Sequence, residues 1–374
     1  MKILAFYLPQ FHTFKENDEW WGKGFTEWTN LKTARPTFKG QHQPRVPLNK
    51  NYYSLLDVET MKWQADIAKK YGVYGFVYYH YWFEEGMLME KPAELMLKSP
   101  EVEMPFCFSW ANHTWKRNWA GKSDSILREQ TYGDEKEWTR HFYYLLQFFK
   151  DPRYIRVDGK PLMILYNPLG VKEFPNMIKC WQKLAKKEGL PGLTICHQQN
   201  QFDHETDAQK NLYNYGIEFQ MNAAVLEFTS KSVKFAAECF LNRIADKLPF
   251  LRCRATTMHY NYDEIWDIVL NQQPRGKTWF PGAFVDWDNT PRRKNRGQVC
   301  TDVTPEKFHY YLSKQIKRAR DVYKKDYLFM FAWNEWGESG YLEPDELYGF
   351  KMLEAVRDAL LENNEFPIYP NFEK

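Results

Sequence analysis

Short apolar segments alternate with amphipathic segments along most of the chain. The apolar segments are rich in β-branched and aromatic residues and predict strands at 2–8, 73–79, 104–110, 161–166, 193–198, 216–221, 280–286 and 327–333. Between several of them, apolar residues recur at spacings of three and four, which predicts helices at 54–71, 135–149, 175–188, 304–323 and 345–362. Strand–helix alternation favours parallel pairing, and eight such strands favour closure. We therefore expect an α/β protein folded as a single (β/α)8 TIM-type barrel.

No internal repeat or low-complexity linker divides the sequence, so residues 1–374 are predicted to form one catalytic barrel domain. Two regions interrupt the regular pattern. Residues 9–53 make a long first connection rich in Trp, Pro and Asn, and a loop of that length in a compact domain is usually functional. Residues from about 222 to 260 are predicted to form a helical insertion. Its apolar stripe favours packing on the barrel, and its Lys and Arg residues leave open the alternative of a surface that contacts a membrane peripherally or binds a partner.

The composition narrows the class of partner. Hydrophobic residues make up 44% of the chain, charged residues 26%, and the formal net charge is only +3, which excludes nucleic acid as the main partner. Aromatic residues reach 18%, including 15 Trp and 24 Tyr. Such side chains combine an apolar face with a polar handle, as a sugar site requires. A large aromatic core accounts for the composition equally well.

The sequence favours a cytoplasmic protein. The N-terminal segment MKILAFYLPQF reaches Pro9 and Gln10 before any cleavage-like site, so it is predicted to be a first strand rather than a signal peptide. The six cysteines are scattered without CxxC or Cys/His metal spacing, which is typical of reduced core thiols. No apolar run is long enough for a transmembrane segment.

Every predicted strand ends in amide, imidazole, carboxylate or aromatic side chains. The active site of an α/β barrel lies at the C-terminal ends of its strands, so these side chains are predicted to line a saccharide pocket. The predicted substrate-binding residues at the strand ends are Gln10, His12, Tyr79, His80, Trp82, Trp110, Asn112, His113, Tyr166, His197, Gln198, Asp286, Asp288, Trp333, Asn334 and Trp336. Glu27 and Trp28 are candidates from the long first connection, with a core or capping role as the alternative.

The predicted catalytic pair is Glu335 and Glu338, in the segment Asn-Glu-Trp-Gly-Glu after the last strand. Residues i and i+3 of a helical turn have Cβ atoms roughly 5–6 Å apart. Glycoside chemistry commonly uses two carboxyl groups, roughly 5–5.5 Å apart in retaining enzymes. The neighbouring tryptophans would lower the local dielectric and raise the pKa of one acid. A solvated surface turn is the alternative interpretation.

Several segments also resemble one known family. AFYLPQFH (5–12), GFTEW (24–28), YGFVYYHYWF (74–83), FSWANHTW (108–115) and FAWNEWGESGYLEPD (331–345) occur in this order. The chain resembles the WbsX-like proteins of bacterial surface-polysaccharide and lipopolysaccharide (O-antigen) gene clusters, which carry a glycoside hydrolase family 99-like domain.

The resemblance implies a (β/α)8 barrel and a retaining, metal-independent enzyme of the endo-α-mannosidase type. By the match of the WNEWGE segment, Glu335 would be the base that deprotonates the 2-hydroxyl of the sugar, and Glu338 the acid/base. The implied partner is an α-linked oligosaccharide or polysaccharide, with no cofactor. The oligomeric state stays open.

Two alternative functions remain. Asp286-Trp287-Asp288 forms a D-x-D triplet, which can hold a metal and a sugar nucleotide in a glycosyltransferase of O-antigen or capsule biosynthesis. No glycine-rich phosphate loop follows the first strand, so direct hydroxyl contacts by these acids are favoured. The basic run 292–296 is typical of a solvated loop, with phosphate contact as the alternative. A non-catalytic glycan-binding protein would use the same aromatic pocket.

Overall fold

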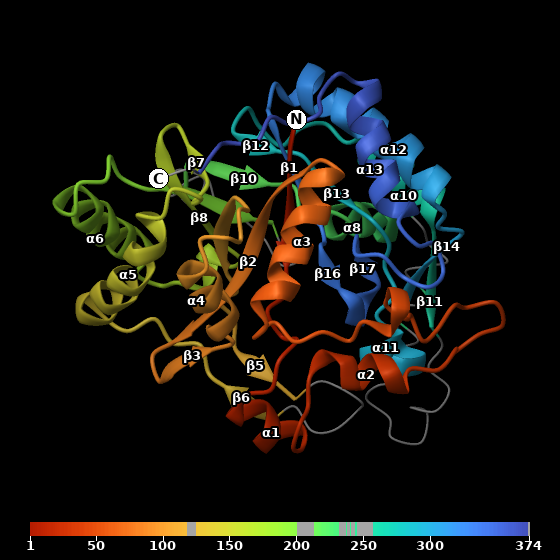
Figure 1. Ribbon diagram of the computed structural model, residues 1–374, viewed down its shortest axis with the longest axis horizontal. Coiled ribbons are helices and arrows are strands. Elements are labelled where there is room, and N and C mark those ends of the chain that lie inside the picture. The colour runs from red at the N-terminus through yellow and green to blue at the C-terminus, as the bar shows by residue number, and fades with distance from the viewer. Residues whose placement is uncertain are drawn as a thin grey trace.

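Nine parallel strands follow one another around a barrel (Figure 1). The structure is a computed structural model that describes residues 1–117, 125–199, 213–231 and 257–372, together with residues 237, 240 and 244. The strand order is β12-β10-β9-β8-β4-β2-β1-β15-β13. The strands are β1 (Lys2–Tyr7), β2 (Val73–Phe83), β4 (Phe106–Trp110), β8 (Lys160–Leu165), β9 (Thr194–Gln198), β10 (Tyr215–Ile217), β12 (Trp279–Phe280), β13 (Gly282–Phe284) and β15 (Tyr327–Phe331). They confirm the predicted strands, with the seventh divided in two.

That seventh strand closes the barrel. Strand β12 pairs with β10, whereas β13 pairs with β15, so the two ends of the sheet are consecutive pieces of one segment. Pro281 separates them, since its ring nitrogen cannot donate to a neighbouring strand. Its carbonyl still accepts a hydrogen bond from the Phe329 amide at 3.1 Å. Gly282 is required here, because a Cβ would overlap the carbonyl oxygen of Glu218.

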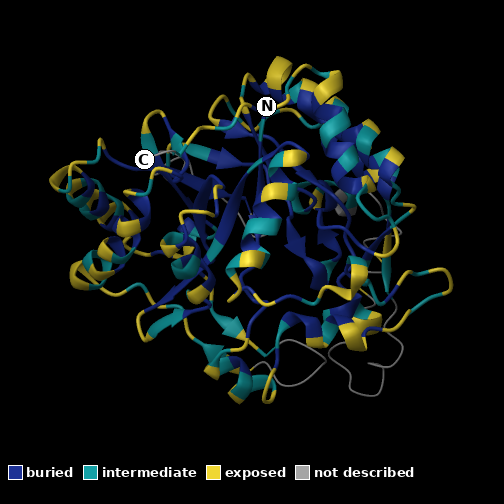
Figure 2. Ribbon diagram, in the orientation of Figure 1, coloured by how far each residue is buried: buried dark blue, intermediate teal, exposed yellow. Residues whose placement is uncertain are grey.

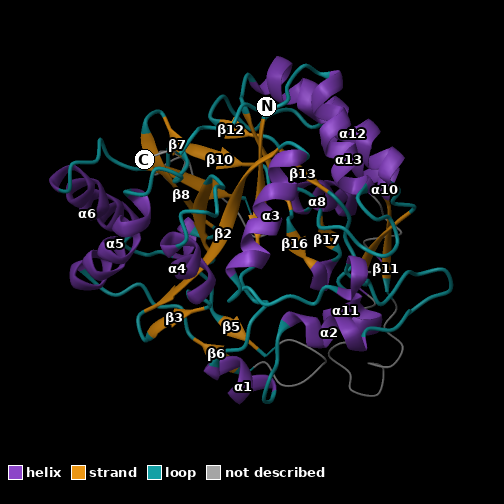
Figure 3. Ribbon diagram, in the orientation of Figure 1, coloured by secondary structure: helices purple, strands orange, loops and turns teal. Residues whose placement is uncertain are grey.

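The outer helices place their apolar faces on the strands. Figure 3 shows α5 and α6 on one side of the strands and α10, α12 and α13 on the other, and Figure 2 shows the helices exposed outward around buried strands. The helices are α3 (Val58–Lys70), α4 (Lys91–Lys98), α5 (Glu135–Phe149), α6 (Phe174–Lys187), α10 (Tyr262–Asn271), α12 (Pro305–Arg318) and α13 (Lys351–Glu362). Helix α5 matches its predicted bounds, because Asp134 caps its first turn through the amides of Lys136 and Glu137.

One predicted helix begins later than expected. The segment 345–362 was expected to be helical throughout, but α13 starts at Lys351. The Asp345 carboxylate accepts hydrogen bonds from the Tyr341 hydroxyl at 2.6 Å and the Tyr348 amide at 2.6 Å. These contacts hold residues 345–349 as a turn, which competes with the helix.

The connections after the strands carry the elements that build the site. They include α1 (Lys15–Trp21), α2 (Glu27–Thr33), β3 (Gly86–Leu88), β5 (Trp115–Lys116), β6 (Ile126–Arg128), α11 (Thr290–Arg293), β16 (Asn334–Glu335) and β17 (Gly340–Tyr341). Figure 1 shows α1, α2, α11, β5 and β6 gathered along the lower side of the view, near β3, which pairs with the C-terminal end of β2. The first connection therefore covers the mouth of the barrel where the active site was predicted.

The predicted insertion begins with helix α8 (Asn222–Lys231), followed much later by β11 (Met258–Asn261), which pairs with β14 (Gln298–Thr301). Most of the segment from 232 to 256 lies outside the described residues. In the part of the chain that the structure describes, no helix has the length and apolar character needed to cross a bilayer.

Candidate active site

Glu335 and Glu338 lie on a single tight turn after β15. Residues 336–338 form one turn of 3-10 helix, entered from Glu335 and ended by Ser339 with a left-handed φ of 54°. Both acids line the same cavity and both reach the Arg292 guanidinium, so they project to the same side. Gly337 between them is required by close packing, because a Cβ would overlap the Glu27 carboxylate and the Arg292 guanidinium. The two carboxylates thus face one cavity, as the spacing of Glu335 and Glu338 in the sequence predicted.

One guanidinium joins three carboxylates at this turn. Arg292, at the end of α11, places Nη2 3.2 Å from Glu335 Oε2 and Nη1 2.8 Å from Glu338 Oε1. Its Nε donates to Glu27 Oε1 at 2.7 Å. The planar fork of an arginine suits this geometry, because its donors point in fixed directions. Glu335 and Glu338 are therefore held within the span of one side chain.

The environment favours a protonated Glu335. Burial, with a smaller contribution from the negative charges of Glu338 and Glu27, raises the pKa of Glu335 to about 8 against the opposing effect of Arg292. A side chain whose pKa lies near neutral pH can exchange a proton efficiently in either direction. Glu338 keeps 22% of its side-chain surface exposed, compared with 7% for Glu335.

Two cavities meet at Glu335. The larger, of about 420 Å³, is lined by Tyr79, Tyr81, Ala111, His113, Tyr166, Phe219, Asn222, Trp287, Asn289, Arg292, Arg293, Gln298, Phe331, Glu335 and Glu338. The smaller, of about 250 Å³, is lined by Leu8, Gln10, Trp21, Tyr81, His113, Thr114, Trp115, Lys116, Leu127, Arg292, Arg293 and Glu335. Five residues belong to both, so the cavities form adjacent parts of one site. Aromatic faces beside hydroxyl and amide groups are suited to binding sugars.

Some of the predicted binding residues do line this site. Tyr79, His113 and Tyr166 contribute to the larger cavity and Gln10 to the smaller one. The side-chain nitrogen of Gln10 is buried without a hydrogen-bond partner among the described residues. An unsatisfied donor at a cavity wall is a group that a polar ligand would satisfy.

The predicted tryptophans pack elsewhere. Trp336 stacks on Tyr341 at 3.7 Å and donates its indole N–H to Glu343 at 2.6 Å. Trp82 stacks on His141 at 4.3 Å. Neither cavity is lined by Trp28, Trp82, Trp110, Trp333 or Trp336, all of which are buried in aromatic clusters. These rings therefore pack in the protein core and do not line the site.

The other inward polar residues are held by the protein itself. The Asn334 amide group bridges the backbone N–H and C=O of Leu8 at 2.7 and 3.1 Å, and thereby ties β16 to β1. Burial lowers the pKa of His80 to about 3, and its ring lies 2.9 Å from that of His141. Neither cavity is lined by His12, His80, Asn112, His197, Gln198 or Asn334. Glu27 lines neither cavity, but it contacts Arg292, and its negative charge helps to raise the pKa of Glu335.

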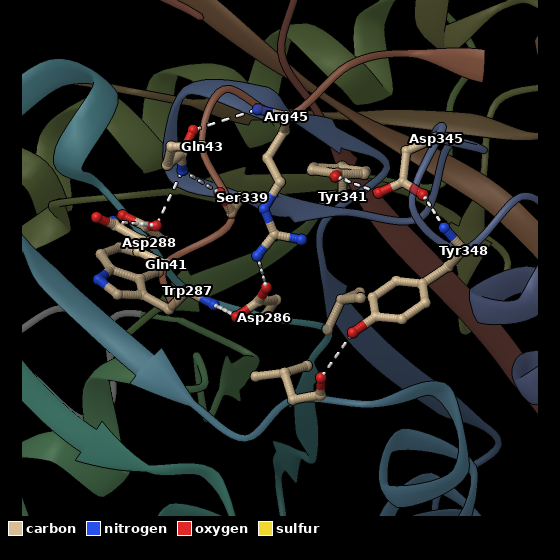
Figure 4. Close-up of polar contacts among 12 residues, drawn as sticks. Gln41, Gln43, Arg45, Asp286, Trp287, Asp288, Ser339, Tyr341, Asp345 and Tyr348 are labelled. Atoms are coloured by element: carbon tan, nitrogen blue, oxygen red, sulfur yellow. Dashed lines mark hydrogen bonds and ion pairs between the residues drawn. The ribbon is translucent and has the colours of Figure 1, made fainter. Parts of the chain in front are cut away.

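The D-x-D triplet points away from Glu335. Because successive residues of an extended segment alternate in direction, Trp287 faces the larger cavity while Asp286 and Asp288 face a separate cavity of about 440 Å³. Figure 4 shows Arg45 pairing with Asp286, at 2.7 Å, and Gln43 reaching Asp288, at 2.9 Å. The predicted hydroxyl contacts of these two acids are thus absent from the cavities at Glu335.

The same contacts bear on the metal hypothesis. Asp288 also accepts hydrogen bonds from Gln41 at 2.8 Å and from the amide and hydroxyl of Thr290 at 2.9 and 2.6 Å. Both oxygens of the Asp288 carboxylate therefore accept hydrogen bonds within the protein, and two of these bonds hold residues 41–43 against the barrel. Among the described residues, no group of three or more His, Cys, Asp or Glu side chains could hold a metal ion. The expectation of metal-independent chemistry stays a prediction.

Sequence reasoning missed several residues that surround Glu335. Tyr81 lies two positions after Tyr79 on β2 and shares its face, so the strand period would have identified it. Arg292 had been assigned to a solvated basic loop, and nothing in the sequence signals its contact with three acids. Phe219, Trp287 and Phe331 also line the larger cavity.

Several solved structures have a similar fold. The solved structure of the GH99 endo-alpha-mannosidase from Bacteroides thetaiotaomicron is similar with a TM-score of 0.56 at 13% identity, over 97% of both chains. The same enzyme in complex with bis-tris propane gives a TM-score of 0.57 at 13% identity, again over 97% of both chains. A glycoside hydrolase-like protein gives 0.57 at 11% identity, over 96% of this chain and 93% of that one. At these identities the likeness establishes the fold alone.

Sequence relatives are closer. Two curated proteins, both named uncharacterized protein WxcX and found in two strains of Xanthomonas campestris pv. campestris, are 31% identical over 363 residues. The match covers 96% of this chain and 49% of each relative, so the chain spans about half their length. A family model described as glycosyltransferase WbsX matches residues 3–356. The resemblance noted in the sequence is confirmed, and the chain belongs to the WbsX family.

Proposed function

We propose that the chain is a carbohydrate-active enzyme that cleaves or transfers α-linked, mannose-type glycans of bacterial surface polysaccharide by a retaining mechanism. The observation that carries this proposal is the pair Glu335 and Glu338, held by the single Arg292 guanidinium at a cavity lined with aromatic and hydroxyl groups. A pair of carboxyl groups at one sugar is the usual requirement for glycoside chemistry.

Glu335 and Glu338 divide the proton transfers of the first step. Ionised Glu335 takes the proton of the sugar 2-hydroxyl, whose oxygen then attacks the anomeric carbon and forms an anhydro-sugar. The bond from that carbon to the leaving oxygen breaks as Glu338 gives this oxygen a proton. The raised pKa of Glu335 supports its part, because a carboxylate with a high pKa is a stronger base.

In the second step the two proton transfers run in the opposite direction. The acceptor can be water, which gives hydrolysis, or a second sugar, which gives transfer. Glu338, now ionised, takes a proton from water, and the water oxygen attacks the anomeric carbon. The 2-oxygen leaves and recovers its proton from Glu335, which gives retention of configuration. If the hydroxyl of a second sugar replaces water, the same residues perform glycosyl transfer. Transfer agrees with the description of the family as glycosyltransferases.

Two cavities that meet at Glu335 favour cleavage within a chain. Sugars on either side of the reacting bond would each occupy one cavity, as an endo-acting enzyme requires. The GH99 enzyme of the similar fold carries endo-alpha-mannosidase in its name, which agrees with this choice of substrate class. The proposal also includes a cytoplasmic location and peripheral contact with a membrane surface.

The test uses defined α-mannotetraoses of different linkage with wild-type protein and the variants Glu335→Gln and Glu338→Gln. We expect each variant to lose at least about a thousandfold in kcat/KM while still binding the oligosaccharide. Proton NMR of the first product should give the α-anomer. Glu101→Gln, an exposed position away from the site, is the matched control.

Near wild-type rates in both site variants would contradict the catalytic assignment, and a β-anomeric first product would contradict retention. Binding of the glycans without turnover of any substrate, together with full biological activity of both variants, would favour the non-catalytic alternative.

A further inference from the structure

The smaller cavity beside Glu335 is the more cationic of the two. Lys116, from β5, and Arg293, from α11, are separated by more than 170 residues in sequence, yet both line it. Among the lining residues that the structure describes, Glu335 is the only acid. Arg293 also lines the larger cavity, but that cavity lacks Lys116 and adds a second acid, Glu338, and most of its other lining residues are aromatic or amide-bearing.

The two cations are available to a ligand. Arg292 also lines both cavities, but it is engaged by Glu27, Glu335 and Glu338. Arg293 and Lys116 are exposed, and no carboxylate of the described residues lies within 4 Å of either charged group. Their charge therefore acts on whatever occupies the cavity.

The cavity also has the other features of a built binding site. Gln10 brings to the wall a buried side-chain nitrogen that has no hydrogen-bond partner in the described part of the chain, and Thr114 adds a hydroxyl. Trp21 and Trp115 contribute aromatic rings to the lining. A pyranose ring could stack on an indole while an acidic substituent meets the cations, since charge-assisted hydrogen bonds are the stronger kind.

We propose that the smaller cavity binds a sugar carrying an anionic substituent, a carboxylate or a phosphate, next to the residue at which Glu335 acts. This inference rests on the proposed function, because it names the substrate class of the same site. The glycan acted on is then acidic, with the charged sugar in the smaller cavity and a neutral sugar in the larger one.

The experiment compares acidic glycans with neutral forms of the same backbone. Polygalacturonate and its carboxyl-reduced form test a carboxylate, and phosphomannan and its dephosphorylated form test a phosphate. Binding is measured by affinity electrophoresis at low and high salt on Glu338→Gln protein, so that turnover does not interfere. We expect one acidic form to bind at least about tenfold tighter than its neutral partner, with a preference that decreases as salt rises.

The variants locate the effect. Lys116→Gln, at a residue that lines only the smaller cavity, should reduce the preference, and adding Arg293→Gln should abolish it. Lys294→Asn is the control, because Lys294 is exposed beside Arg293 but lines neither cavity. Thermal unfolding checks that each variant is folded.

Equal affinity for both members of each pair, or a preference that survives the double variant, would overturn the inference. That result leaves the proposed function standing if Glu335→Gln and Glu338→Gln abolish cleavage of neutral α-mannosides. Conversely, an acidic preference in a protein whose site variants keep full activity would overturn the proposed function alone.

Discussion

Arg292 donates its Nε–H to the Glu27 carboxylate at 2.7 Å, and Glu27 is completely buried. Glu27 is the first residue of α2, and its second carboxylate oxygen has no hydrogen-bond partner among the described residues. The contact fixes the plane of the guanidinium, and that plane determines where Nη1 and Nη2 meet Glu338 and Glu335. The long first connection therefore acts on the site in two ways: Gln10 and Trp21 line the smaller cavity, and Glu27 holds Arg292 from outside both cavities.

Glu27→Gln should lower the pKa of Glu335. The negative charge of Glu27 helps to keep that pKa raised, so its removal makes ionised Glu335 more favourable. If ionised Glu335 is the base, the rising limb of the kcat/KM profile should move to lower pH. The measurement is a pH–rate profile of the variant beside wild type. An unchanged limb would show that Glu335 does not control it.

Arg292→Gln should have the opposite effect on pH and a larger effect on folding. Arg292 opposes the rise in the pKa of Glu335, so its loss should move the same limb to higher pH. It also leaves buried acids without a counter-charge, which typically costs about 3–5 kcal/mol of unfolding free energy. Urea unfolding would measure this cost. Arg293→Gln, next in sequence but exposed, should change stability by less than about 0.5 kcal/mol.

Most of the barrel could be predicted from the sequence. Its strands are short and apolar, and its helices carry apolar residues at helical spacing, so local pattern and tertiary fold agree. The split of the seventh strand could not be predicted from local pattern, because it depends on which strands pair with the segments before and after Pro281. The late start of α13 depends on side-chain contacts of Asp345, which compete with helix formation.

The site was predicted less completely, for a physical reason. Position at a strand end was informative for Gln10, Tyr79 and Tyr166, but it does not say which way a side chain points. Trp336 follows the same rule and yet stacks on Tyr341 in the core. Arg292 could not be found at all, because its importance comes from acids far away in sequence.

Asp288→Asn should weaken folding without creating a metal requirement. Its two oxygens accept hydrogen bonds from Gln41, Gln43 and Thr290, and an amide nitrogen in place of one oxygen would face donors. The expected loss is about 1–3 kcal/mol of unfolding free energy. Activity per folded molecule should be unaffected by a chelator in both proteins. A Mn²⁺-dependent activity abolished by Asp288→Asn would instead support a sugar-nucleotide transferase.

The buried carboxyl of Glu343 should make the protein less stable as pH rises. Glu343 accepts hydrogen bonds from the Tyr53 hydroxyl at 2.7 Å, the Trp336 indole at 2.6 Å and the Gln64 amide at 2.6 Å. Burial nevertheless dominates and raises its pKa to about 7. An acid whose pKa is higher in the folded than in the unfolded state stabilises folding while both states are protonated, below about pH 4. That stabilisation is lost as pH rises to about 7.

Glu343→Gln isolates this effect. Wild-type unfolding free energy should fall between pH 5 and pH 8, and Glu343 should contribute up to about 3 kcal/mol of that fall. The variant should start less stable at pH 5, because its amide cannot match all three donors, and should then show a flatter profile. Chemical unfolding at several pH values gives the comparison, with exposed Glu346→Gln as the control. Parallel profiles for the Glu343 variant and wild type would mean that Glu343 stays ionised in the folded protein, so that its three hydrogen bonds outweigh burial.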